Sequence, residues 1–237
     1  APCRVTSPLF TSLVAGVTFF LMAGIALVQR DLTATRAGLR DWFAQRHGDG
    51  VEISELRTAN RATGWSSESL VFTLTVDGAS TEHVIRIPPA GGGIFPRYDL
   101  KAQAQTQELL HNHGIATPSP IVHEPDRSWI GSEFLLMPRI VGHTPSDISY
   151  AVRGWLHDAD RQVQRRAHDT FVETLARLHR VPVDSAPWLA RPGGVGIDAE
   201  LDWWRDYVAW ATDDQVPDLM GEAFDWLVRH KPEHTPE

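Results

Sequence analysis

Cysteine is almost absent from this sequence, and an excess of basic residues is missing as well. Cys3 is the only cysteine among 237 residues. A disulfide framework or a thiolate metal cluster needs several cysteines, so both are excluded and a reducing, cytoplasmic compartment is favoured. The formal net charge is -8, whereas binding to nucleic-acid phosphates depends on a basic surface. The sequence therefore predicts no nucleic-acid partner.

Charged residues are missing from the stretch Leu9 to Val28, LFTSLVAGVTFFLMAGIALV. A helix of this length would span roughly 30 Å, the thickness of the hydrocarbon core of a membrane. One interpretation is a membrane anchor or signal segment. The other is a buried leader, because the run includes two glycines and three hydroxyl side chains. Residues 1–30 are thus predicted to be an apolar leader, and they provide the only route to a membrane that the sequence indicates.

The remaining sequence changes from strand-like to helical periodicity near residue 140. In the first half, Asp31 is a good helix N-cap, and Asp77-Gly78 is a strong hairpin signal between two β-branched runs. The second half carries apolar residues at helical spacing. We expect helices at 32–46, 98–114, 164–181, 200–211 and 219–230, and strands at 51–57, 69–76, 82–89, 119–124 and 133–140. This pattern predicts an α+β fold with a five-stranded antiparallel sheet, one inserted helix and a mostly helical second lobe.

The stretch TGWSSESLVFTL, Thr63 to Leu74, places a glycine and several serines directly before a strand. A glycine there lets the backbone approach a ligand, and successive N–H and hydroxyl groups can bind phosphate oxygens. The alternative is an ordinary polar turn. Arg86 follows in the next strand, where its charge could pair with phosphates or simply face solvent. The later run FLLMPRIVG leads into a linker whose backbone could bind an adenine edge.

The order and spacing of these pieces resemble the aminoglycoside phosphotransferase and choline kinase-like family, which has a protein-kinase-like fold. The resemblance runs from Asp31 to the last residue. It rests on TGWSSESLVFTL, HVIRIPP, FPRYDLKAQAQTQELL, ATPSPIVHEPDRSWIGSEFLLMPRIVGHTPSD and VETLARLHRVPVD. The sequence is most similar to the bacterial branch related to the kinase domains fused to acyl-CoA dehydrogenases. This implies a nucleotide-binding lobe at 31–140 and a partial helical substrate lobe at 141–237.

The resemblance also implies a nucleotide site. Arg86 occupies the strand position that lysine fills in protein kinases, and Gln103 occupies the helix position of its usual acidic partner. Glutamine can hydrogen-bond Arg86 but cannot neutralise it, which puts the ion pair of the kinase template in question. The implied cofactor is ATP or GTP with Mg²⁺, and the implied acceptor is a small-molecule alcohol. The implied nucleotide-binding residues are Gly64, Trp65, Ser66, Ser67, Arg86, Gln103, the gatekeeper Met137 and the hinge residues Arg139 and Ile140.

The catalytic loop of this family, H-G-D-x-x-x-x-N, and its later metal-binding aspartate are not found at the family positions. HGD at His47 to Asp49 precedes the glycine loop and is interpreted as the turn that ends a helix. LDWW, Leu201 to Trp204, is interpreted as part of a packed helix, and HNHG, His111 to Gly114, as a helix end. We therefore expect no catalytic and no metal-binding residue in this chain, which we interpret as a fragment ending before the catalytic loop.

Three functional hypotheses follow. The first is a nucleotide-dependent small-molecule O-phosphotransferase, of which this chain would be an inactive fragment. The second is a non-catalytic, pseudokinase-like nucleotide-binding module, with a membrane tether at Leu9 to Val28 as one version of it. The third is an unrelated α+β domain whose glycine loop is only a turn. Trp203, Trp204 and Trp210 are expected to pack in the core more than to line an acceptor pocket.

Overall fold

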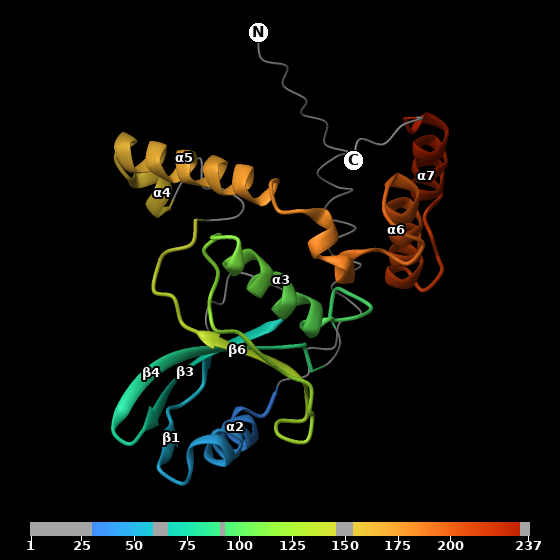
Figure 1. Ribbon diagram of the computed structural model, residues 1–237. Helices are drawn as coiled ribbons and strands as arrows, with labels where there is room; N and C mark the ends of the chain where they lie inside the picture. Colours follow the sequence, from blue (N-terminus) through green and yellow to red (C-terminus); the bar gives the residue numbers. More distant parts are fainter. Residues whose placement is uncertain (1–29, 59–65, 91–92, 146–153, 233–237) are drawn as a thin grey trace. The chain divides into compact units, whose positions relative to one another are not determined.

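The computed structural model describes residues 30–58, 66–90, 93–145 and 154–232, which form two compact units (Figure 1). The first, called the sheet unit, comprises the described parts of Arg30–Pro88 and Asp99–Leu189. The second, called the helical unit, comprises those of Pro89–Tyr98 and Ala190–Glu237. The apolar stretch Leu9 to Val28 lies outside the described residues, and none of the helices in the described ranges is long and apolar enough to cross a membrane.

An antiparallel sheet of six strands forms the centre of the sheet unit. The strand order is β1-β3-β4-β6-β5, and β2 pairs with β3 beside β1. The strands are β1 (Val51–Ile53), β2 (Arg57–Thr58), β3 (Glu68–Val76), β4 (Ala79–Ile87), β5 (Val122–Glu124) and β6 (Phe134–Pro138). The expected α+β class with an antiparallel sheet is confirmed, with one strand more than the five expected.

The extra strand arises because the stretch predicted as one strand at 51–57 is interrupted at Ser54. The Ser54 N–H donates to the Thr73 carbonyl over 3.0 Å, while the Thr73 N–H donates to the Ser54 hydroxyl over 2.9 Å. A side-chain oxygen thus replaces a backbone carbonyl in the ladder, so regular pairing stops there. Leu56 then turns into the core, with 8% of its surface exposed.

The β3–β4 hairpin confirms the turn predicted at Asp77-Gly78. Both residues have positive φ, 50° at Asp77 and 81° at Gly78, as a tight type I′ hairpin turn requires. The pairing is unbroken from Val76 opposite Ala79 to Glu68 opposite Ile87. Because side chains alternate between the two faces of a strand, this turn determines which residues of β4 point to each face.

One helix covers each face of the sheet (Figure 1). Helix α2 (Leu32–His47) begins at the N-cap Asp31, whose carboxylate accepts from two backbone N–H groups, and buries Leu39, Trp42 and Phe43 against the sheet. Helix α3 (Leu100–Asn112) packs Leu100 and Ala104 against β6 on the opposite face. The α2 face carries the larger cluster of buried side chains, and the α3 face carries a smaller one.

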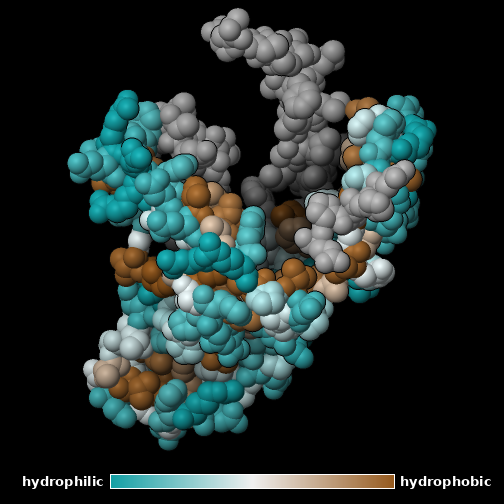
Figure 2. All heavy atoms as spheres, turned by 45° about the horizontal axis from the view of Figure 1, so that its top comes forward, coloured by the Kyte–Doolittle hydropathy of each residue, from teal (hydrophilic) through white to brown (hydrophobic). Residues whose placement is uncertain are grey.

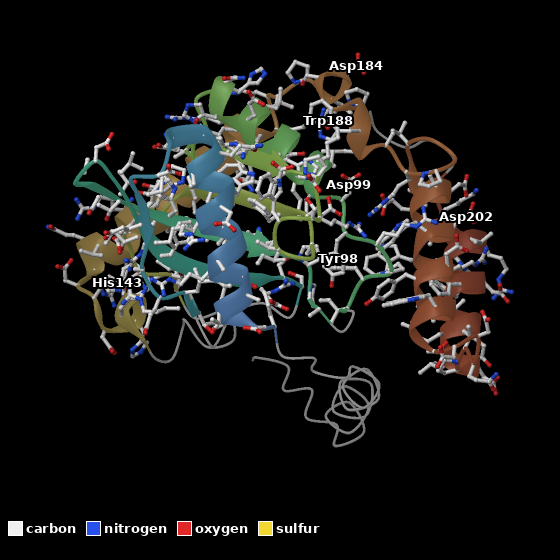
Figure 3. All side chains as sticks on the ribbon, turned by 90° about the horizontal axis from the view of Figure 1, so that it is seen from below. Tyr98, Asp99, His143, Asp184, Trp188 and Asp202 are labelled. Atoms are coloured by element: carbon white, nitrogen blue, oxygen red, sulfur yellow. The ribbon has the colours of Figure 1, made fainter. Side chains whose placement is uncertain are left out.

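The sheet unit continues with α4 (Trp155–Asp158), α5 (Arg161–Leu178) and two short 3₁₀ helices, η1 (Val183–Ser185) and η2 (Pro187–Leu189). Helix α5 begins three residues before the predicted start because the Asp160 carboxylate caps the N–H groups of Gln162 and Val163. The indole N–H of Trp188 in η2, a residue labelled in Figure 3, donates to the Thr106 hydroxyl of α3 over 2.9 Å. This hydrogen bond connects the end of the sheet unit to α3.

The helical unit contains α6 (Ile197–Ala211) and α7 (Asp218–His230). The Tyr207 ring of α6 stacks on Trp203 with centroids 5.6 Å apart, and its hydroxyl donates to the Ile94 carbonyl over 2.8 Å. Trp204 and Trp210 keep 46% and 43% of their surfaces exposed, so these two do not pack in the core, where the three tryptophans were mostly expected. Figure 2 shows hydrophobic residues at the surface among hydrophilic ones.

Candidate functional site

The sheet face that carries α3 also carries Arg86. On β4, Ile85 and Ile87 point into the core under α2, so strand alternation directs Val84 and Arg86 to the α3 face. On β6, Met137 packs in the α3-side cluster with Leu135. The predicted strand cation and the predicted gatekeeper therefore share one face of the sheet, on strands that pair directly through Arg86–Leu135 and Val84–Met137.

Arg86 has donors to spare on this face. Its terminal NH2 group approaches the Ser67 hydroxyl at 3.4 Å, and its Nε is buried without a hydrogen-bond partner among the described residues. A buried guanidinium N–H that lacks an acceptor is costly, and an anionic oxygen is its strongest partner. Arg86 and Ser67 therefore form a pair of donors suited to one anion. Ser67 lies directly before β3, and Arg86 lies in β4.

The predicted loop residues fall partly outside the structure. Gly64 and Trp65 are not among the described residues, whereas Ser66 and Ser67 are half-buried immediately before β3. The structure places the Ser67 hydroxyl 3.4 Å from the Arg86 NH2 group, and a nucleotide-binding role for Ser66 and Ser67 stays a prediction. Gly64 and Trp65 remain predictions.

Gln103 lies on α3, half-buried, in the helix that faces Arg86's side of the sheet. Its backbone N–H donates to the Asp99 carbonyl over 3.2 Å within the first turn of the helix. None of the hydrogen bonds found within the described ranges joins the Gln103 side chain to Arg86, so that partnership remains a prediction. One turn further along, the Gln107 side-chain oxygen is buried without a hydrogen-bond partner in the described part of the chain.

The hinge has a geometry that the sequence did not reveal. The Arg139 N–H donates to the Glu82 carbonyl over 3.0 Å, and its guanidinium contacts the Glu82 carboxylate at 2.6 Å. Arg139 is therefore engaged with β4. Backbone groups alternate in direction along an antiparallel strand, so the Pro138 carbonyl at the end of β6 points away from β4.

The same alternation leaves an open edge beside the hinge. Strand β5 pairs with β6 only as far as Val122 opposite Leu136. The Pro138 carbonyl and the Ile140 N–H follow this last pair, with the Ile140 side chain 66% exposed. Pro138 was not among the predicted site residues. Backbone groups point to alternate sides from one residue to the next, so the direction of the Pro138 carbonyl could be inferred only once the pairing of Arg139 with Glu82 was known.

Behind the hinge, on the α2 face, His83 is enclosed by aromatic rings. It lies opposite Pro138 in the ladder, with the Phe72 ring at 5.7 Å and the Phe43 ring at 6.0 Å between centroids. Burial lowers the pKa of His83 from its ordinary value, because the charged imidazolium loses hydration there. The lowered pKa favours the neutral imidazole, whose Nε2 lies 2.9 Å from the Thr81 hydroxyl.

The three motifs that we interpreted as non-catalytic, HGD, LDWW and HNHG, lie in or at the ends of helices. His47 ends α2, and the Gly48 N–H donates to the Ala44 carbonyl, so HGD is the helix-ending turn that we expected. HNHG ends α3, with Gly114 at a φ of 72°, and LDWW lies within α6. Within the described ranges, no three or more His, Cys, Asp or Glu side chains are grouped so that they could hold a metal ion.

Residues 59–237 match the family model of the phosphotransferase enzyme family. The chain belongs to this family. Acyl-CoA dehydrogenase family member 11 of Homo sapiens is 29% identical over 161 residues, covering 65% of this chain and 19% of that protein. The Rattus norvegicus protein of that name is 25% identical over 185 residues, covering 78% and 23%. The chain spans about a fifth of the length of these curated relatives.

Membership of the phosphotransferase enzyme family confirms the resemblance and excludes the hypothesis of an unrelated α+β domain. It also identifies the fold as protein-kinase-like, with the antiparallel sheet and α3 as its first lobe. The family match begins at residue 59, so α2, β1 and β2 of this chain precede it. These elements nevertheless supply Leu39, Trp42 and Ile53 to the main core.

Proposed function

We propose that this chain binds a purine nucleoside triphosphate on the α3 face of its sheet, within a protein that transfers a phosphoryl group to the hydroxyl of a small molecule. The observation that carries the proposal is Arg86, a half-buried cation with a spare Nε donor beside the Ser67 hydroxyl. Family membership supplies the reaction class. In phosphoryl transfer the protein acts mainly by positioning and by electrostatic stabilisation, which such a cation provides.

The base of the nucleotide would lie at the open edge after β6. There the Pro138 carbonyl would accept, and the N–H of Ile140, two residues further along the chain, would donate. The Watson–Crick edge of adenine offers the complementary pair, an amino donor beside a ring-nitrogen acceptor. Guanine offers the reverse order, so this edge favours ATP over GTP. Met137, 6% exposed on the adjoining face, would limit how deeply the base enters.

Arg86 and Ser67 would bind phosphate oxygens. Mg²⁺, when it accompanies the nucleotide, neutralises charge on the β- and γ-phosphates. The described ranges contain no grouped metal ligands, so we assign no residue of this chain to the ion. The acceptor is proposed to be a small-molecule alcohol, and no described residue is assigned as its base.

Titration calorimetry of the 237-residue chain with ATP tests the proposal. Arg86→Met should weaken ATP binding by about tenfold or more, because a charge-assisted contact to phosphate is lost. Arg40→Met is the matched control. Arg40 lies on α2, is 58% exposed and contacts only its neighbour Asp41 among the ion pairs of the described residues, so its loss should leave binding unchanged.

Two outcomes would decide against the proposal. Absence of ATP binding by the unmodified chain would contradict it outright, and equal binding by both variants would remove Arg86 from the site. ADP formation in the presence of small alcohols would favour the phosphotransferase over the non-catalytic module. Binding without turnover is expected under both hypotheses, because we expect no catalytic residue in this chain.

A further inference from the structure

We infer that Arg30 is a positioning residue for the nucleotide site, an inference that rests on the proposed function. Arg30 stands just before the N-cap of α2 and precedes the family match, which begins at residue 59. No sequence motif drew attention to it, since its partners lie 38 and 58 residues away.

The Arg30 guanidinium closes the open end of the β3–β4 hairpin. Its Nε donates to the Glu68 carboxylate over 2.5 Å, and its NH2 donates to the Pro88 carbonyl over 3.0 Å. The side chain is 10% exposed. Glu68 is the first residue of β3, and its ladder partner Ile87 is the last residue of β4. Arg30 therefore joins the two strands at the end opposite their turn.

That end of the hairpin holds the two candidate phosphate contacts. Ser67 directly precedes Glu68, and Arg86 directly precedes Ile87, with 3.4 Å between the Ser67 hydroxyl and the Arg86 NH2 group. The end of a hairpin far from its turn is where pairing opens most readily. Without Arg30, opening of the last pair would let Ser67 and Arg86 separate, and an anion could no longer contact both.

Helix α2 fixes the position of Arg30. The Asp31 side chain caps the helix, and Leu39, Trp42 and Phe43 anchor it in the core. The Arg30 guanidinium therefore connects α2, which precedes the family match, to the two strands that carry or adjoin Arg86 and Ser67. Arg30 touches neither the nucleotide nor any reacting atom, so its effect acts through the geometry of these two residues.

Three variants of the 237-residue chain test this role. Arg30→Gln keeps hydrogen-bonding capacity but loses the charge, and Arg30→Lys keeps the charge. Arg46→Gln is the control, because Arg46 joins the other end of α2 to Glu124 over 3.0 Å, away from Ser67 and Arg86. The measurements are the dissociation constant of ATP by calorimetry, amide hydrogen exchange of the free chain at residues 67–70 and 85–87, and the melting temperature.

Arg30→Gln should weaken ATP binding by about tenfold and speed exchange at these residues by a similar factor, the order expected for losing a buried charged contact. Arg30→Lys should recover part of both. Arg46→Gln should change neither beyond about twofold and should lower the melting temperature less, because the Arg46 side chain is 38% exposed. A purely structural Arg30 would instead change binding and exchange only in proportion to the loss of melting temperature, in both glutamine variants.

Failure of this inference is distinguishable from failure of the proposed function. If the unmodified chain binds no ATP, the proposed function is wrong and so is the positioning role that rests on it. If the chain binds ATP but Arg30→Gln leaves the affinity within about twofold, the positioning role alone is overturned. Unchanged exchange at residues 67–70 in Arg30→Gln would also overturn it, because the hairpin end would then not depend on Arg30.

Discussion

Replacing Gly38 by alanine should destabilise α2, although alanine is the better helix former. A Cβ atom at residue 38 would lie 1.9 Å from the Trp129 carbonyl oxygen and 3.1 Å from the Ile130 side chain. The first contact is with backbone, so no rotamer change can relieve it. Helix α2 or the loop at Trp129 would have to move by more than about 1 Å to restore a normal contact, and α2 is held by buried Leu39.

The magnitude follows from two opposing effects. Glycine to alanine within a helix stabilises by about 1 kcal/mol, whereas overpacking a well-packed contact costs about 1–3 kcal/mol and more when backbone must move. We therefore expect Gly38→Ala to lower the opening free energy of α2 by about 1–2 kcal/mol. Native-state amide exchange measures this for each helix separately.

Gly221 provides the matched control. It lies inside α7, and no heavy atom other than those of its own helix and chain neighbours lies within 4 Å of the position of its Cβ. Gly221→Ala should therefore raise the opening free energy of α7 by up to about 1 kcal/mol. If Gly38→Ala is also stabilising, the close packing of α2 on the Trp129 loop is wrong.

Two further predictions concern the hinge and the residue behind it. Ile140→Pro removes the N–H proposed to bind adenine, so it should weaken ATP binding by about tenfold in calorimetry. Val141→Pro, at a residue 78% exposed, should not weaken it. Equal effects of the two substitutions would refute the hinge contact. Burial lowers the pKa of His83 below the ordinary histidine value of 6.5. The stability that its neutral form contributes is therefore full above about pH 6.5 and is lost as the pH falls towards the lowered pKa. Urea unfolding between about pH 7.5 and about pH 5, roughly the range over which histidine titrates, should therefore show a steeper loss of stability for the native chain than for His83→Phe. Parallel curves would contradict this.

Local sequence signals predicted the elements that depend on local chemistry. Asp31 marked the start of α2, and Asp77-Gly78 marked the hairpin turn, because capping and positive φ are properties of one or two residues. The Ser54 interruption was not predictable, since it depends on a hydrogen bond to Thr73 across the sheet. The class of the fold followed from the order of elements, whereas the number of strands did not.

The candidate site divides in the same way. Arg86 and Ser67 were predicted from residue type and order, and the structure brings them together. Pro138 was missed, because its open carbonyl follows from the pairing of Arg139 with Glu82, 57 residues away. The partner strand determines which side each backbone group of a strand faces, and the sequence alone does not show which strands pair.

Strand β4 explains why the site and the core depend on one another. Its alternate residues serve opposite faces: Ile85 and Ile87 pack under α2, while Arg86 between them points to the α3 face. A slip of one residue in the pairing would bury Arg86 in the apolar core and expose both isoleucines. The turn at Asp77-Gly78 fixes the register at one end of the hairpin, and the contacts of Arg30 fix it at the other. The anion-binding geometry is therefore a consequence of the same register that builds the core.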